Sequence, residues 1–196
     1  MSKAWNDFFP WVLPFTPGVP FSMARAEIRS AAIDFCEESL CWREDLDDVS
    51  VLAAVTEHAL DPPDNATAIA ALETVTPSTS SKAWTAGTHY TFDAISGLLT
   101  LTVSPGSAYT LEIVAAVKPS RTSATIKDSI FENFVDGIAA KAIQRLLQIP
   151  GKQWSNPALA MEYEERFLEE AGKAKRKQQK QYTRGNSRVA WRTFGQ

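Results

Sequence analysis

Few side chains in this 196-residue sequence have the types and spacing that catalytic or metal chemistry requires. Its two histidines, His58 and His89, have no neighbouring Cys/His cluster, and the sequence contains no HxxxH or CxxC spacing. The motifs GxSxG, GxxxxGKS/T and GxGxxG, which mark nucleophile elbows and phosphate-binding loops, are also absent from it. We therefore expect no catalytic, cofactor-binding or metal-binding residues, and a protein that is not an enzyme.

Carboxylates are abundant, and several occur in adjacent pairs, notably Glu37-Glu38, Asp47-Asp48 and Glu164-Glu165. Neighbouring residues of a helix point in different directions, so such pairs are not arranged as an acid and a base. We interpret them as solvated surface. The alternative is that they line a channel or pair with Lys and Arg of a neighbouring chain.

The C-terminal tail has a chemical pattern of its own. Residues 173–196 hold eight Lys or Arg and no acid, whereas residues 1–172 hold 12 Lys or Arg and 23 Asp or Glu. The net charges are therefore +8 and −11. Near the end of the chain, arginines four residues apart alternate with apolar side chains: Arg184, Arg188, Val189, Trp191, Arg192 and Phe194.

Three interpretations of this tail compete. It is a solvated, frayed chain end, a nucleic-acid-binding segment whose cations contact phosphates and whose aromatics stack on bases, or a peptide that becomes ordered on a protein partner. Attraction to phosphate needs only charge, whereas Val, Trp and Phe flanked by arginines suit a protein groove with an acidic rim. We favour docking on a protein.

The only cysteines, Cys36 and Cys41, are five residues apart in a predicted helix. They are expected to project from different faces of that helix, so they could not bridge within it. We interpret them as reduced, core-facing thiols of a protein made in the cytosol.

The N-terminal residues 1–21 are rich in large aromatic side chains. Asp7 and four prolines interrupt this segment and exclude a membrane-spanning helix, and no other stretch reaches about 18 apolar residues, so no membrane contact is expected. The segment is predicted to be an extended arm that packs on its own domain or on a neighbouring chain. The arm residues expected at a contact between subunits are Trp5, Phe8, Phe9 and Trp11.

Helical periodicity appears in three stretches. Ser22 is the predicted N-cap of a first helix that runs to about Trp42. An apolar stripe over residues 130–147 predicts a central core helix, which Pro150-Gly151 ends. Asn156 and Pro157 are predicted to start a third helix that runs to about residue 181.

Between the first two helices, short Thr/Val-rich segments are separated by Pro, Gly and Ser. They predict an antiparallel β-lobe of roughly four to six strands, with a hairpin in FDAISGLLTL. The predicted fold is therefore α+β: an antiparallel helical bundle with a β-lobe inserted between its first and second helices. Its expected parts are the arm 1–21, the helical domain 22–48 and 119–181, the lobe 49–118 and the basic docking tail 182–196.

Two stretches of the sequence resemble a known family. PFTPGVPFSMARAEIRSAAIDFCEESLCWRE is similar to the start of head-to-tail connector (adaptor) proteins of tailed phages, especially short-tailed ones. The matching positions are Ile28, Arg29, Ala31, Ala32, Phe35, Cys36, Ser39 and Trp42. The stretch from VAAVKPSRT to FLEEAG resembles the second half of the same family, in which a long helix ends in a P-G-K-x-W-x-x-P turn. Here that turn is Pro150, Gly151, Lys152, Trp154 and Pro157, and the resemblance covers about residues 14–172.

The resemblance implies a ring, dodecameric in this family, that lies beneath the portal protein in the neck of the virion. Such a ring extends the DNA channel and offers a platform to the tail or nozzle protein, and the C-terminal segment inserts between portal subunits. We expect a structural protein of the virion, made in the host cytoplasm, whose acidic body lets DNA pass through the lumen without specific binding.

Two other function classes remain as alternatives. One is a nucleic-acid-binding accessory protein of DNA packaging, a ring similar to a small terminase. The other is an enzyme acting on the cell wall or on nucleic acid, for which the sequence offers no paired acid and base.

Overall fold

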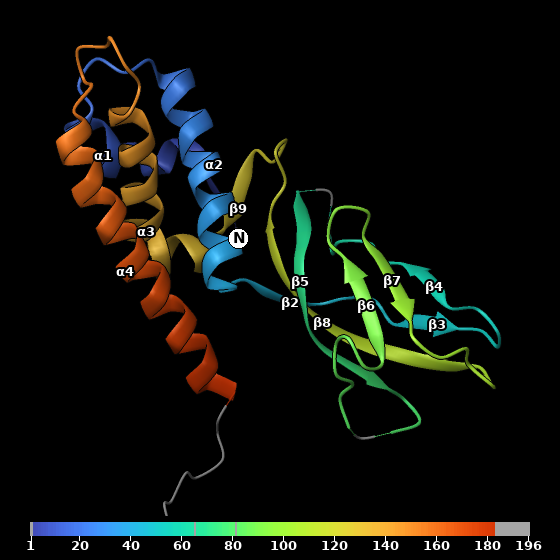
Figure 1. The fold of residues 1–196 in the computed structure, drawn as a ribbon. Helices are drawn as coiled ribbons and strands as arrows, with labels where there is room; N and C mark the ends of the chain where they lie inside the picture. Colours follow the sequence, from blue (N-terminus) through green and yellow to red (C-terminus); the bar gives the residue numbers. More distant parts are fainter. Residues whose placement is uncertain (1, 65, 81, 183–196) are drawn as a thin grey trace, which may run out of the picture.

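The computed structural model describes residues 2–64, 66–80 and 82–182, with backbone alone for 180–182. Three long helices form one half of the molecule, and most of the strands form the other (Figure 1). The long helices are α2 (Phe21–Ser39), α3 (Asp128–Leu147) and α4 (Pro157–Tyr182). Helix α3 packs against both α2 and α4, so it is the central element of the helical half.

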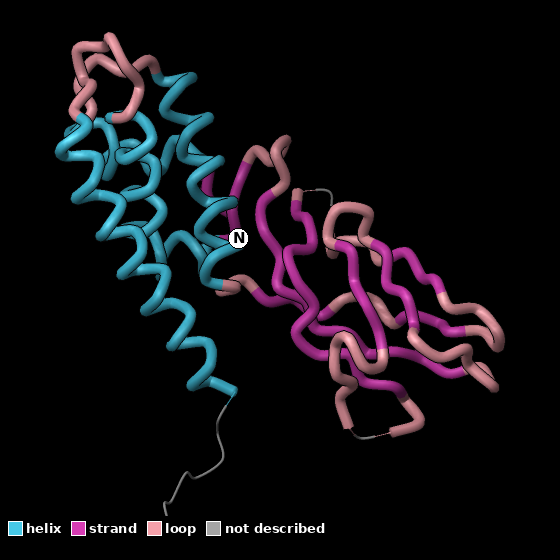
Figure 2. Tube along the Cα trace, viewed as in Figure 1, coloured by secondary structure: helices cyan, strands magenta, loops and turns pink. Residues whose placement is uncertain are grey.

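The N-terminal residues cover this helical half with short elements. They are β1 (Ser2–Ala4), the 3-10 helix η1 (Trp5–Phe8), α1 (Phe9–Val12) and a second 3-10 helix η2 (Leu13–Phe15). Strand β1 pairs antiparallel with β9 (Thr125–Lys127), and α1 packs on α3. Figure 2 shows that the β1–β9 pair lies beside the helices, apart from the other strands.

The other half contains two antiparallel sheets. In the first, β8 (Tyr109–Pro119) pairs with β5 (Thr67–Pro77) on one side. On its other side, β8 pairs with β2 (Arg43–Asp45) and then β3 (Val49–Val51). The second sheet has the order β4 (Glu57–Ala59), β7 (Leu98–Leu101) and β6 (Tyr90–Asp93). The predicted FDAISGLLTL hairpin is confirmed, since β6 and β7 pair from Tyr90–Leu101 to Asp93–Leu98.

The predicted layout, a helical bundle with a single inserted β-lobe, was wrong. The chain is mixed α and β, but its described residues form four α-helices and nine strands in three antiparallel sheets. Strands β1, β2 and β9 lie outside the segment predicted to be the lobe. Each has only three residues and is fixed by a partner far along the chain, so no local periodicity marks it.

The prediction of an extended N-terminal arm was also wrong. Pro10 and Pro14 stand in the first turns of α1 and η2, where a backbone N–H is not needed for helical hydrogen bonding. The prolines therefore break one long helix into several short ones, and these fold back onto α3.

The boundaries of the first helix differ from the prediction at both ends. The N-cap is Pro20 instead of Ser22, and α2 ends at Ser39, where Leu40 adopts left-handed backbone angles with φ of 51°. The Ser39 hydroxyl donates to the Phe35 carbonyl, and the Leu40 N–H donates to the Cys36 carbonyl. Trp42 therefore lies in the segment that enters the sheet, with its carbonyl accepting from the Val117 N–H.

This early helix end changes the relation between the two cysteines. Cys41 lies beyond α2, and the left-handed turn at Leu40 brings its thiol back to that of Cys36. Both cysteines are free and buried. Their mutual hydrogen bond, followed by burial, raises the pKa of Cys36, and the same hydrogen bond lowers the pKa of Cys41. The prediction that they project from different faces of one helix was wrong.

The second and third helices agree with the prediction. Helix α3 ends at Leu147, and α4 begins at Pro157 and ends one residue beyond the expected residue 181. The predicted cap is confirmed, because the Asn156 side-chain oxygen accepts from the Leu159 N–H at 3.1 Å.

The three long helices meet around one aromatic ring. Phe35 of α2 is fully buried, with its ring centroid 5.5 Å from that of Phe134 and 6.1 Å from that of Phe167. Gly137 of α3 lies against this ring, and a Cβ atom there would stand 2.4 Å from Phe35 Cε2. The absence of a side chain at Gly137 therefore makes room for the Phe35 ring between the helices.

We predict that Gly137→Ala lowers the free energy of unfolding by about 1–3 kcal/mol, because the new methyl group overlaps a buried ring. This loss outweighs the gain of up to about 1 kcal/mol in helix propensity. Gly172→Ala in α4 is the matched control, since its nearest atom is the flexible Arg176 Nη1 at 3.6 Å, and it should be neutral or stabilising. Urea denaturation compares the two variants. Equal free energies of unfolding for the Gly137→Ala and Gly172→Ala variants would contradict close packing of Phe35 against Gly137.

Candidate interaction surfaces

The residues with catalytic potential lie apart from one another. His58 is buried in β4, opposite Leu99 of β7. His89 is exposed, its Nδ1 accepts from the Thr85 N–H at 3.1 Å, and its ring stacks on Trp84 with a centroid distance of 5.8 Å. Among the described residues, no three His, Cys, Asp or Glu side chains lie close enough together to hold a metal ion.

The aromatic residues of the N-terminal segment divide into buried and exposed ones. Trp5 and Phe8 are buried in their own chain: the Trp5 indole N–H donates to the Ser123 carbonyl at 2.8 Å, and Phe8 meets Phe131 edge-on at 4.8 Å. These two side chains anchor the segment to the helical half. Of the four residues predicted for a contact between subunits, Trp5 and Phe8 are thus enclosed within the chain itself.

The other two predicted contact residues reach the surface. Phe9 is partly buried and stacks on Phe21 with centroids 5.4 Å apart, and Trp11 is 38% exposed. Phe15 and Phe21, at 48% and 65% exposure, extend the same segment with further exposed rings. A set of large exposed aromatic side chains on one short segment is typical of a surface that another molecule covers.

A cavity of about 180 Å³ opens beside these exposed rings. We call it the aromatic pocket, and its lining includes Trp11, Phe15, Asp136, Ile143, Tyr163 and Arg166. Phe15 packs edge-on against Tyr163 with centroids 5.8 Å apart. The Arg166 Nη2 atom lies 3.9 Å from the Asp136 Oδ1 atom at the rim. The pocket is therefore apolar inside and carries one cation and one anion at its edge.

Helix α4 has a second apolar surface, which we call the outer stripe. It consists of Met161 and Leu168, which are seven residues apart and 67% and 55% exposed. Residues seven apart lie on the same side of a helix, so the two side chains are neighbours along one flank. Figure 1 places α4 at the edge of the helical half that faces away from the sheets.

The predicted P-G-K-x-W-x-x-P turn connects α3 to α4. Two backbone hydrogen bonds close the turn. The Ser155 N–H donates to the Lys152 carbonyl at 3.1 Å, and the Asn156 N–H donates to the Leu147 carbonyl at 3.0 Å. Gly151 has a φ of 70°, which favours glycine. Trp154 is partly buried and packs toward Gly18, whereas four predicted packing residues are exposed: Pro150, Gly151, Lys152 and Pro157. Packing at this turn therefore depends on Trp154.

The sheet half ends in an uncharged tip. The loops 52–56 and 102–108 contain no Asp, Glu, Lys, Arg or His, and they are joined by a hydrogen bond from the Ala54 N–H to the Pro105 carbonyl at 2.9 Å. Leu52, Val55 and Val103 are 60%, 39% and 75% exposed there. By contrast, residues 43–119 as a whole hold ten Asp or Glu and three Lys or Arg, a net charge of −7.

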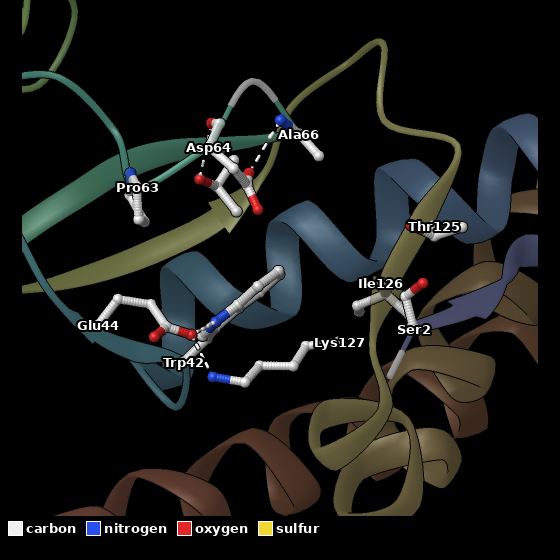
Figure 3. A pocket seen from close by; sticks show the side chains of 10 residues that line it. Ser2, Trp42, Glu44, Pro63, Asp64, Ala66, Thr125, Ile126 and Lys127 are labelled. Atoms are coloured by element: carbon white, nitrogen blue, oxygen red, sulfur yellow. Dashed lines mark hydrogen bonds and ion pairs between the residues drawn. The ribbon is translucent and has the colours of Figure 1, made fainter.

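A cavity of about 300 Å³ separates the two halves and is drawn in Figure 3. The Trp42 indole N–H donates to a Glu44 carboxylate oxygen at 2.7 Å, and the Lys127 ammonium pairs with the same oxygen. Glu44 belongs to β2 and Lys127 to β9, so this ion pair joins the sheets to the helical half. Its charged groups already satisfy one another, and we interpret the cavity as a structural joint.

The predicted portal-binding residues, Arg184, Arg188, Val189, Trp191, Arg192 and Phe194, lie outside the described residues. Within the part of the chain that the structure describes, no helix combines the length and apolar character needed to cross a bilayer. No family model matches the chain. No curated protein matches it either. The resemblance to phage connectors therefore stays a prediction.

Proposed function

We propose that this protein is a head-to-tail adaptor of a tailed phage, a structural protein that forms a ring beneath the portal. The observation that carries the proposal is the exposed aromatic surface of the N-terminal segment, with Trp11, Phe15 and Phe21 open to solvent in a single chain. Surfaces of this kind are covered in an assembly. The resemblance to phage connectors supplies the kind of assembly.

The order of elements is compatible with the resemblance. The quoted N-terminal stretch contains α2, and β8 ends in Lys118-Pro119, which agrees with the strand ending in K-P of the family pattern. The short strand β9 lies between β8 and α3. Helix α3 then leads through the Gly151 turn into α4. These elements supply the helical half, which in this proposal forms the body of the ring.

The basic tail attaches the ring to the portal. Helix α4 extends to Tyr182, so residues 183–196 follow directly from the end of a long helix. Arg184, Arg188 and Arg192 pair with an acidic groove of the portal protein, while Trp191 and Phe194 fill apolar sites within it. Each tail binds weakly, but once one tail of a ring is docked the others bind intramolecularly and add avidity.

The rest of the surface suits the neck of a virion. An acidic lumen would repel the phosphates of DNA, so the genome would pass without binding. The uncharged tip around Leu52 and Val103 offers a contact to the tail or nozzle protein that is independent of salt.

The alternative, a DNA-binding accessory protein of packaging similar to a small terminase, rests on the same tail. The eight Lys or Arg of residues 173–196 would neutralise phosphates. We favour portal docking because Val189, Trp191 and Phe194 add apolar anchors that phosphate binding does not need.

We predict that deleting residues 183–196 abolishes attachment to the purified portal, because the deletion removes both the arginines and the aromatic anchors. The deletion leaves α4 intact, so circular dichroism and the unfolding midpoint should match those of the full chain. Co-sedimentation with portal measures attachment. Unchanged attachment would refute the docking role of the tail.

We predict that replacing Arg184, Arg188 and Arg192 by Gln weakens portal binding by roughly 10–100-fold for one tail, as expected for three partly exposed ion pairs. Replacement by Glu should weaken it further, because like charges then repel in the groove. Binding of tail peptides to portal at two salt concentrations checks this. Equal effects of Gln and Glu would show that the groove is not acidic.

We predict that the isolated protein does not shift duplex DNA at any salt concentration between about 50 and 200 mM. The packaging-accessory alternative predicts a shift at about 50 mM salt that weakens by roughly 10³-fold or more at about 200 mM, as counterion release requires. A gel-shift assay across these concentrations decides between them. Strong, salt-dependent binding that the loss of residues 183–196 weakens would favour the alternative.

A further inference from the structure

Helix α4 has two exposed flanks that face roughly opposite directions. Its buried residues, Ala160, Phe167, Ala171 and Ala174, face the core. At about 100° per residue, the five residues from Tyr163 to Leu168 turn the helix by about 140°. The outer stripe of Met161 and Leu168 therefore lies on one flank, and Tyr163 and Arg166 of the aromatic pocket lie on the other.

The aromatic pocket has the size and lining to hold an apolar side chain. Its volume of about 180 Å³ is comparable with the roughly 150 Å³ cavities that hold a benzene molecule. Trp11 and Phe15 form its exposed wall, and Ile143 is buried within it. A methionine or leucine side chain from another molecule would bury its own surface together with that of both rings.

The charges beside the two surfaces are complementary. Glu165 is exposed and lies between Met161 and Leu168 along the helix, next to the outer stripe. Arg166 stands at the rim of the pocket and is 54% exposed, and its contact to Asp136, at 3.9 Å, is long and solvated. Such an exposed ion pair contributes little to stability. A carboxylate from another molecule can therefore replace Asp136 as the partner of Arg166 with little loss of free energy.

We propose that the outer stripe of one copy packs into the aromatic pocket of the next copy. Because the two surfaces are different and lie on opposite flanks, this contact is head-to-tail, and its repetition closes into a ring or continues as a filament. In the contact, Leu168 enters the pocket beside Trp11 and Phe15. Met161, on the same flank of α4, packs outside the pocket, and Glu165 meets the neighbour's Arg166. This inference rests on the proposed function and names the interface that builds the ring.

Single-site variants and a mixing experiment test the interface. Leu168→Glu blocks the stripe and Phe15→Glu blocks the pocket, so each should lower the assembled fraction by about tenfold or more, since a charge is buried without a partner. Ile95→Glu is the control: Ile95 is 98% exposed and lies in the turn between β6 and β7, outside both surfaces. Light scattering gives the mass, and circular dichroism confirms folding of each variant.

Mixing the Leu168→Glu and Phe15→Glu variants tests whether the stripe of one copy binds the pocket of another. The Phe15→Glu chain keeps a stripe and the Leu168→Glu chain keeps a pocket, so together they should form one-to-one heterodimers and nothing larger. Native mass spectrometry resolves this species. If the mixture stays monomeric, or if Leu168→Glu assembles as well as Ile95→Glu, the inference is overturned. A ring built through another surface would leave the adaptor function intact.

Charge reversal tests the ionic part of the contact. Glu165→Arg and Arg166→Glu should each reduce assembly, and the double variant should recover it, because every interface then pairs a cation on the stripe side with an anion at the neighbour's pocket rim. Glu112→Arg is the control for a charge reversal outside the interface, since Glu112 is exposed on β8 in the sheet half, and it should assemble normally. If the double variant assembles no better than the single variants, the pairing of Glu165 with the neighbour's Arg166 is overturned. A wild-type chain that stays monomeric at every concentration overturns the interface, and portal attachment through the tail is then judged by its own assay.

Discussion

The crossing of α2, α3 and α4 depends on one contact, the Phe35 ring lying where Gly137 has no side chain. That contact allows α2 and α3 to pack closely, and Phe134 and Phe167 then pack against the Phe35 ring. With the helices fixed at this spacing, Phe131 is positioned to receive Phe8 and Trp11 of the N-terminal segment. Both exposed flanks of α4 are oriented by the same crossing, so the surfaces that we assign to assembly depend on a buried glycine.

The two halves of the molecule are held together by polar contacts as well as by the chain. Glu44 of β2 accepts the Trp42 indole N–H and pairs with Lys127 of β9, and Lys118 of β8 pairs with Glu37 of α2. Partly exposed ion pairs add little stability, but those that bridge two elements restrict their relative orientation. The sheet half is therefore set at a defined angle to the helical half.

Local signals in the sequence were enough to predict α3, α4, the Asn156 cap and the β6–β7 hairpin, because each depends on periodicity or on a turn within a few residues. The early end of α2 was missed, since Leu40 in a left-handed conformation is an unusual choice that tertiary packing imposes. The pairing of β1 with β9 was also missed, because it joins residues more than 120 positions apart.

Exposed aromatics were foreseen in the N-terminal segment, but only the fold separates the buried Trp5 and Phe8 from the exposed Trp11. The outer stripe was missed, although Met161 and Leu168 are seven residues apart and fall outside the buried seam of α4.

The anchoring of the N-terminal segment has a consequence for the order in which the chain folds on the ribosome. Trp5 donates to a carbonyl 118 residues later, and Phe8 packs on Phe131, so these aromatic side chains lack these two partners until most of the protein has been synthesised. At roughly 5–20 residues per second, that interval lasts about 6–24 s. During it, Trp5 and Phe8 cannot reach their final buried positions, and the synthesis of α3 supplies the surface on which Phe8 is buried.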